Sequence, residues 1–162
     1  MMSKTHIVFS LLVCLVLFDL MVIDSPLLFF MSLLFGTLLP DIDLPTSYLG
    51  KRLWFLSWPI SLFSRHRGLF HGLFFGAFVF FVLLLVGLPF SVYFGFLVGF
   101  ASHLFIDALT PAGIMPLQPL LSFRVRGFVK TGSLLELFFF MGVVMLIILD
   151  VYYKAMHLIA VL

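Results

Sequence analysis

Long apolar stretches, each ended by a proline, a glycine or a charged residue, run through almost the whole 162-residue sequence. About 20 consecutive apolar residues are enough to cross the hydrocarbon core of a bilayer as a helix. Hydrophobic residues make up 64% of the chain and charged residues only 10%, which leaves too little polar surface for a water-soluble globule of this size. The sequence therefore predicts an integral membrane protein.

The apolar stretches predict one all-α membrane domain over residues 1–162, a bundle of about five transmembrane helices. The predicted spans are residues 7–23, 27–39, 69–88, 90–109 and 133–153. The first also resembles the apolar region of a signal peptide, but Asp19 stands where a cleavage site would need small residues, which favours an uncleaved anchor. The break at Leu88-Pro89 predicts that the third and fourth spans form a helical hairpin.

Two segments lie outside these spans. Residues 53–63 are apolar but too short to cross the bilayer, so they predict an interfacial or re-entrant helix. Residues 112–122 lie among three prolines and predict a loop or a shallow re-entry. The bundle is therefore expected to carry one or two short helices beside its spans.

Basic residues divide unequally between the two sides of the predicted bundle. Only Lys154 falls on one side, and the other eight fall on the opposite side: Lys4, Lys51, Arg52, Arg65, Arg67, Arg124, Arg126 and Lys130. The positive-inside rule then places the N-terminus in the cytoplasm and the C-terminus outside the cell (inner) membrane. The net charge of +2, with no basic run, excludes nucleic acid as a partner. The single cysteine, Cys14, is predicted to be a small buried apolar residue.

Histidine and aspartate side chains gather at the predicted cytoplasmic face. Ionisable residues are costly in a membrane and are functional hypotheses by default. The opposite face has only Asp24, Asp150 and His157, and none of them has a second candidate ligand at a suitable spacing. Residues that merely extend to water at the interface would be expected at both faces, so the asymmetry favours a metal site. The candidate metal ligands are His6, Asp41, Asp43, His66, His71, His103 and Asp107.

The spacing within two pairs bears on how they could share an ion. His103 and Asp107 are four residues apart, so they lie on one helix face, as two ligands or as a ligand and its orienting partner. Asp41 and Asp43 alternate in a proline-bracketed segment that is expected to be extended, so both reach one ion only if the backbone kinks.

The remaining histidine pair, His66 and His71, is five residues apart with Gly68 between them. The two side chains converge only if this glycine bends the chain. Glu136 lies one turn inside the last span, after residues 131–133, which form a plausible helix cap. Glu136 is either an acid next to the helix cap, a metal ligand or a general base, and it is the candidate catalytic residue.

Several strings taken in order resemble the YdjM-like family, which is described as membrane-bound, metal-dependent hydrolases, some of them regulated by LexA. The strings are THI, LLPDIDLPTSYLG, HRGLFH, GFASHLFIDALTPAGI and TGSLLE. The resemblance covers nearly the whole chain and implies the same seven residues as the metal-binding set. The family pattern favours a hydroxyl residue and a serine where this chain has Phe70 and Gly72. A more distant likeness is to zinc-dependent phospholipase C proteins.

Imidazole and carboxylate ligands together suit Zn²⁺, Mn²⁺ or Fe²⁺, and seven candidates exceed the needs of one tetrahedral ion. We therefore expect one or two divalent ions, with Zn²⁺ or Mn²⁺ favoured. The expected function is hydrolysis of a phosphoester or other amphiphilic, lipid-like substrate at the cytoplasmic leaflet. Arg67 and Lys130, with Arg65, are candidates for binding a phosphate head group.

Other function classes compete with this hypothesis. The chain has no HExxH motif, which argues against an intramembrane metalloprotease. A metal-ion binding or transport protein without hydrolytic activity is the main alternative, and a bundle in which the polar cluster only fixes helix packing is another. The sequence leaves the substrate and the oligomeric state open.

Overall fold

The structure is a computed structural model in which residues 1–63 and 68–161 are described. Its elements are α1 (Ser3–Leu20), α2 (Pro26–Leu38), the 3₁₀ helix η1 (Leu39–Asp43), α3 (Tyr48–Arg52), α4 (Trp54–Phe63), the 3₁₀ helix η2 (Leu69–His71), α5 (Leu73–Leu85), α6 (Phe90–Ala108) and α7 (Leu134–Val161). No strand occurs in these two ranges, so the predicted all-α membrane fold is confirmed.

Within the described residues, four helices are long and apolar enough to cross a membrane. They are Ser3–Leu20, Pro26–Asp43, Phe90–Ala108 and Leu134–Ala160, and they correspond to the first, second, fourth and fifth predicted spans. The third predicted span, residues 69–88, is shorter in the structure, where α5 has only 13 residues. Such a helix rises about 20 Å, which is less than the hydrocarbon thickness. It does contact α6, as the predicted hairpin requires.

The second span continues past its proline instead of becoming extended. Residues Leu39–Asp43 form a 3₁₀ turn directly after α2, with Pro40 in its first positions, where the missing N–H costs nothing. The prediction of an extended segment at Asp41 and Asp43 is therefore wrong. The turn lengthens the second span to 18 residues.

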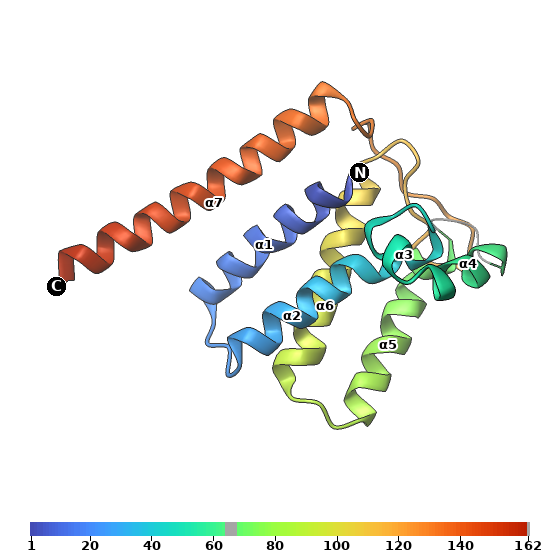
Figure 1. Ribbon diagram of the computed structural model, residues 1–162, viewed down its shortest axis with the longest axis horizontal. Coiled ribbons are helices and arrows are strands. Elements are labelled where there is room, and N and C mark those ends of the chain that lie inside the picture. The colour runs from blue at the N-terminus through green and yellow to red at the C-terminus, as the bar shows by residue number, and fades with distance from the viewer. Residues whose placement is uncertain (64–67, 162) are drawn as a thin grey trace.

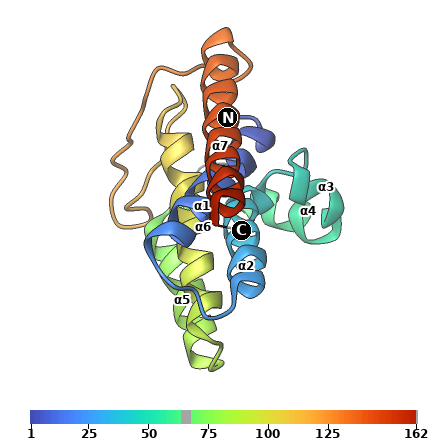
Figure 2. The ribbon, with the colours of Figure 1, turned by 90° about the vertical axis from the view of Figure 1, so that its left-hand side faces the viewer.

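The short segments between spans lie near one end of the bundle. The predicted helix at residues 53–63 is present as α4, preceded by α3, whose first turn is capped because Ser47 Oγ accepts a hydrogen bond from the Gly50 N–H at 2.9 Å. Figure 2 shows α3 and α4 on one side of the bundle and the segment between α6 and α7 on the other. Residues 112–122 contain no helix, as predicted, and Ile114 pairs with Val125 in an isolated bridge.

Helices α2 and α6 pack with their backbones in direct contact (Figure 1). A Cβ atom added at Gly99 of α6 would collide with the Leu33 carbonyl oxygen of α2, and one at Gly95 would collide with the Phe29 carbonyl oxygen. The four-residue spacing of these glycines is the usual one for close helix pairs in membranes. Only glycine permits this approach, so α2 and α6 form the centre of the bundle.

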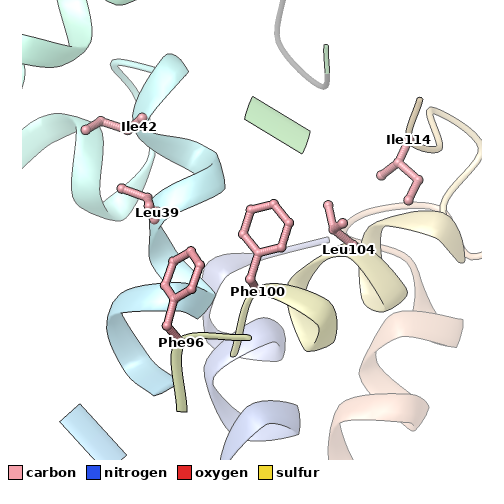
Figure 3. Close-up of a cluster of buried hydrophobic side chains, with 6 residues drawn as sticks. All are labelled: Leu39, Ile42, Phe96, Phe100, Leu104 and Ile114. Carbon is pink, nitrogen blue, oxygen red and sulfur yellow. The ribbon is translucent and has the colours of Figure 1, made fainter. Parts of the chain in front are cut away.

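A cluster of buried apolar side chains seats η1 against α6 (Figure 3). Its members are Leu39, Ile42, Phe96, Phe100, Leu104 and Ile114. A second cluster joins α1 to α2 and includes Cys14, whose side chain is only 1% exposed, so the prediction of a buried apolar cysteine is confirmed. The first cluster therefore holds η1 against α6, and the second holds the C-terminal half of α1 against α2.

We predict that Gly99→Ala destabilises the protein by about 2 to 3 kcal/mol, because the new methyl group must force α2 away from α6. Denaturation of the purified protein in mixed micelles measures this loss. Gly142→Ala on α7 is the matched control, since nothing lies within 4 Å of the position of its added Cβ. Equal stability of the two variants would contradict the close packing of α2 and α6.

Candidate metal centre

Five of the seven predicted ligands come together in the part of the chain that the structure describes. They are His6 from α1, Asp41 from η1, His71 from η2, and His103 and Asp107 from α6. They form two overlapping groups, His6 with His103 and Asp107, and Asp41 with His71 and His103. Within each group the ligand atoms lie within 4.8 Å of one another. His103 belongs to both groups and stands at the centre.

The orientation of His103 is fixed by the backbone of α2. Its Nδ1 atom lies 2.6 Å from the Thr37 carbonyl oxygen. A carbonyl only accepts, so Nδ1 carries the hydrogen and donates it. The other ring nitrogen, Nε2, is then left with a lone pair, which is the state in which histidine binds a metal. This Nε2 lies 3.3 Å from Nε2 of His71.

The spacing of three ligand atoms fits a metal shell. Asp41 Oδ1 lies 3.7 Å from Nε2 of His71 and 3.7 Å from Nε2 of His103, which closes a triangle with the 3.3 Å side between the histidines. Neighbouring ligands of a tetrahedral zinc ion are about 3.3 to 3.6 Å apart, for bonds of about 2.0 to 2.2 Å. The two imidazoles and the carboxylate therefore lie close to the separations of ligands around a small divalent cation.

Asp107 connects the two groups through its two oxygens. Oδ2 lies 3.6 Å from Nε2 of His71 and 3.8 Å from Nε2 of His103. Oδ1 lies 3.3 Å from Nε2 of His6 and 2.8 Å from the Met1 nitrogen. The carboxylate can thus bind one ion and orient His6, or bridge two ions, so the donor set fits either number.

The cluster is almost closed to solvent. Asp41 is 15% exposed, whereas the side chains of the two histidines that flank it are at most 1% exposed. His6 Nδ1 is buried and has no hydrogen-bond partner among the described residues. Carboxylates buried in a membrane protein are costly without a compensating charge, which a divalent cation would supply.

The other predicted site residues are not members of the two ligand groups found among the described residues. Asp43 is buried, but the groups found in the described ranges do not include it. Lys130 is exposed in the segment between α6 and α7. Glu136 is fully buried in the first turn of α7 and belongs to neither group. The predicted His66, Arg65 and Arg67 lie outside the described residues.

Sequence reasoning missed the acceptor that orients His103. The Thr37 contact uses a backbone carbonyl, which every residue has, so no side-chain pattern marks it. The Thr37 hydroxyl itself donates to the Leu33 carbonyl at 2.8 Å and lies 2.9 Å from Ser10 Oγ on α1. The sequence therefore carried no signal for this contact.

Comparison with known proteins gives consistent family matches. A family model described as YdjM inner membrane protein matches residues 1–162. The chain is 40% identical over 93 residues to the inner membrane protein YdjM of Escherichia coli (strain K12), a match that covers 54% of this chain and 47% of that protein. It is 34% identical over 137 residues to the uncharacterized protein YvsG of Bacillus subtilis (strain 168), covering 84% of this chain and 85% of that protein. No solved structure matches significantly.

We predict that purified protein holds one or two divalent ions per chain and that His103→Ala or Asp107→Ala abolishes this binding, because each variant removes a donor from the shared centre. Plasma mass spectrometry after reconstitution with Zn²⁺ or Mn²⁺ measures the ion content. His157→Ala, at the far end of α7, is the control and should keep the full content. Wild-type protein without stoichiometric metal would exclude this centre.

Proposed function

The chain belongs to the YdjM inner membrane protein family, and from its buried histidine–aspartate cluster we propose that it is a metal-dependent hydrolase. The observation that carries the proposal is the approach of His71 Nε2 and His103 Nε2 to each other at 3.3 Å, with carboxylate oxygens beside both. Such mixed donors suit Zn²⁺ or Mn²⁺. A cation there would polarise a phosphoryl oxygen and lower the pKa of bound water.

The residues of the cluster divide the work between holding and orienting. Asp41, His71 and His103 would hold the cation, and the Thr37 carbonyl keeps the His103 ring turned toward it. Asp107 would add a further oxygen ligand or orient His6. Asp41 is the most exposed member, so substrate would approach from its side.

We propose that the cluster faces the cytoplasm, with the N-terminus inside and the C-terminus outside. The cluster lies at the end of the bundle where α1 begins and α6 ends, and the C-terminus lies at the far end of α7 (Figure 1). Lys51 and Arg52 are exposed in α3 near the same end, whereas Lys154 lies near the C-terminus. This distribution supports the orientation through the positive-inside rule.

A lipid-like phosphoester is the substrate class that the surroundings favour. An apolar groove of about 310 Å³ lies along η2 and the first turns of α5, lined by Leu69, Phe70, Phe74, Phe75 and Phe78. Two of its lining residues, Leu69 and Phe70, directly precede the ligand His71. An acyl chain in this groove would place a head group near the cluster. Lys130 and Arg67 stay the candidates from the sequence for binding its phosphate.

We predict that the reconstituted protein hydrolyses phosphoesters only when loaded with metal, and that a chelator stops the reaction. Asp41→Asn and His103→Ala should lower the rate by about 100-fold or more, because the loss of even an outer-shell partner typically costs 10- to 100-fold. Release of phosphate or alcohol from phospholipids and soluble phosphoesters measures the rate. Metal bound without any hydrolysis would instead support the metal-binding or transport alternative.

Chain-length dependence tests the groove separately. We predict that Phe74→Trp, which narrows the groove, raises KM several-fold for a long-chain phosphoester and leaves a short-chain soluble phosphoester unaffected. Phe81→Trp is the control, because Phe81 is exposed on the same helix outside the groove. An equal effect on both substrates would exclude the groove as the acyl site.

A further inference from the structure

We propose that Glu136 is a positioning residue that holds His6 in the cluster, in place of the general-base role that the sequence suggested. This inference rests on the proposed metal-dependent function, since it concerns the same centre. Glu136 is buried and belongs to neither ligand group found among the described residues, and the inference gives this acid a role.

The carboxylate of Glu136 is occupied by three donors. Oε1 accepts from the Met2 N–H at 2.7 Å and from the Thr5 hydroxyl at 2.8 Å. Oε2 accepts from the Gly132 N–H at 2.6 Å. The side chain is fully buried. A general base must reach a water molecule and take its proton, and an enclosed carboxylate already held by three fixed donors is poorly suited to that task.

The same turn of α1 joins Glu136 to the metal ligands. Thr5 and Met2, which bind Glu136, belong to the turn that carries His6, and the His6 N–H lies 3.4 Å from the Met2 carbonyl. The His6 ring is stacked on the His103 ring, with centroids 4.1 Å apart. Its Nε2 lies 3.3 Å from Asp107 Oδ1. Releasing the turn from Glu136 would therefore let His6 leave the cluster.

The local structure of α7 holds Glu136 for this contact. Ser133 Oγ accepts from the Glu136 N–H at 3.3 Å, and Glu136 Oε2 reaches back to Gly132, which together resemble a capping box. The predicted cap at residues 131–133 is thus present, and the positive end of the helix favours the carboxylate there. Hydrogen bonds within residues 132–136 therefore help to orient the Glu136 side chain for its contact with α1.

The opposite ends of α1 and α7 provide a matched control. There, Lys154 Nζ of α7 lies 2.9 Å from Asp19 Oδ1 of α1 and 2.8 Å from Asp150 Oδ2. The Lys154–Asp19 ion pair and the Glu136 hydrogen bonds both join α1 to α7, but only those of Glu136 adjoin His6. Removing each in turn separates positioning of the ligand from general packing of the helix pair.

The experiment compares Glu136→Ala, Glu136→Gln, Thr5→Val and Lys154→Met in the full chain. We expect Glu136→Ala to weaken Zn²⁺ binding by about 10- to 100-fold and to raise the carbethoxylation rate of His6, measured by peptide mass spectrometry. Thr5→Val removes only one of the three hydrogen bonds to Glu136, so it should change Zn²⁺ affinity and the His6 carbethoxylation rate in the same directions but by less. This variant replaces Glu136→Ala in the test if Glu136→Ala does not fold. Glu136→Gln keeps an oxygen that can accept hydrogen bonds from Met2 and Thr5 at the start of α1, so it should retain most of the Zn²⁺ binding that Glu136→Ala loses.

Hydrolysis at saturating Zn²⁺ distinguishes the two roles of Glu136. If Glu136 is a positioning residue, the hydrolysis rate of Glu136→Gln should recover as Zn²⁺ fills the metal site. Loss of hydrolysis in Glu136→Gln with full metal and unchanged His6 reactivity would make Glu136 the base and overturn the proposal. Equal weakening by Lys154→Met would also overturn it. If wild type binds no Zn²⁺, the proposed function fails, and His6 reactivity alone still decides the positioning role.

Discussion

The close approach of α2 and α6 is the constraint on which the site depends. Packed helices usually lie 8 to 10 Å apart, with side chains between them. Here Gly99 lets the backbone of α2 touch α6, and one turn further the Thr37 carbonyl reaches the His103 ring at 2.6 Å. The turn that follows α2 then delivers Asp41 to the same histidine. A wider helix pair would separate the ligand from its orienting carbonyl and from its neighbouring carboxylate.

Packing in a membrane also explains why the site lies at one end of the bundle. Lipid tails are as apolar as leucine, so helices associate through close packing and hydrogen bonds between polar groups. The middle of the bundle uses small polar contacts, such as Thr37 with Ser10 and the Ser32 hydroxyl with the Val92 carbonyl. Charged groups are confined to the ends, where water and opposite charges lower their cost. At one end they form the His/Asp cluster, and at the other the contacts of Lys154.

Much of this arrangement could be predicted from the sequence, because it follows from hydropathy and from helical periodicity. The four long apolar helices and the pairing of His103 with Asp107 are of this kind. The 3₁₀ turn Leu39–Asp43 was not predictable, because Leu39 precedes Pro40 and a residue before a proline tends to be extended. Burial of Leu39 and Ile42 against α6 favours the compact turn instead. The proposed role of Glu136 depends on the Met2 N–H and the Thr5 hydroxyl, which lie far away in the chain, so no local pattern marks their contact with this acid.

The departure from the family pattern around His71 has a packing explanation. In place of a hydroxyl residue before the histidine, Phe70 stacks edge-on against Phe75 with ring centroids 4.7 Å apart. After it, a Cβ atom at Gly72 would lie 2.8 Å from the Gln118 carbonyl oxygen, and the next N–H, of Leu73, donates to the Pro116 carbonyl at 2.8 Å. This chain thus holds the His71 turn by aromatic packing on one side and by backbone contact with residues 116–118 on the other. These contacts fix His71 without side-chain hydroxyls, so the absence of the hydroxyls is compatible with the proposed metal centre.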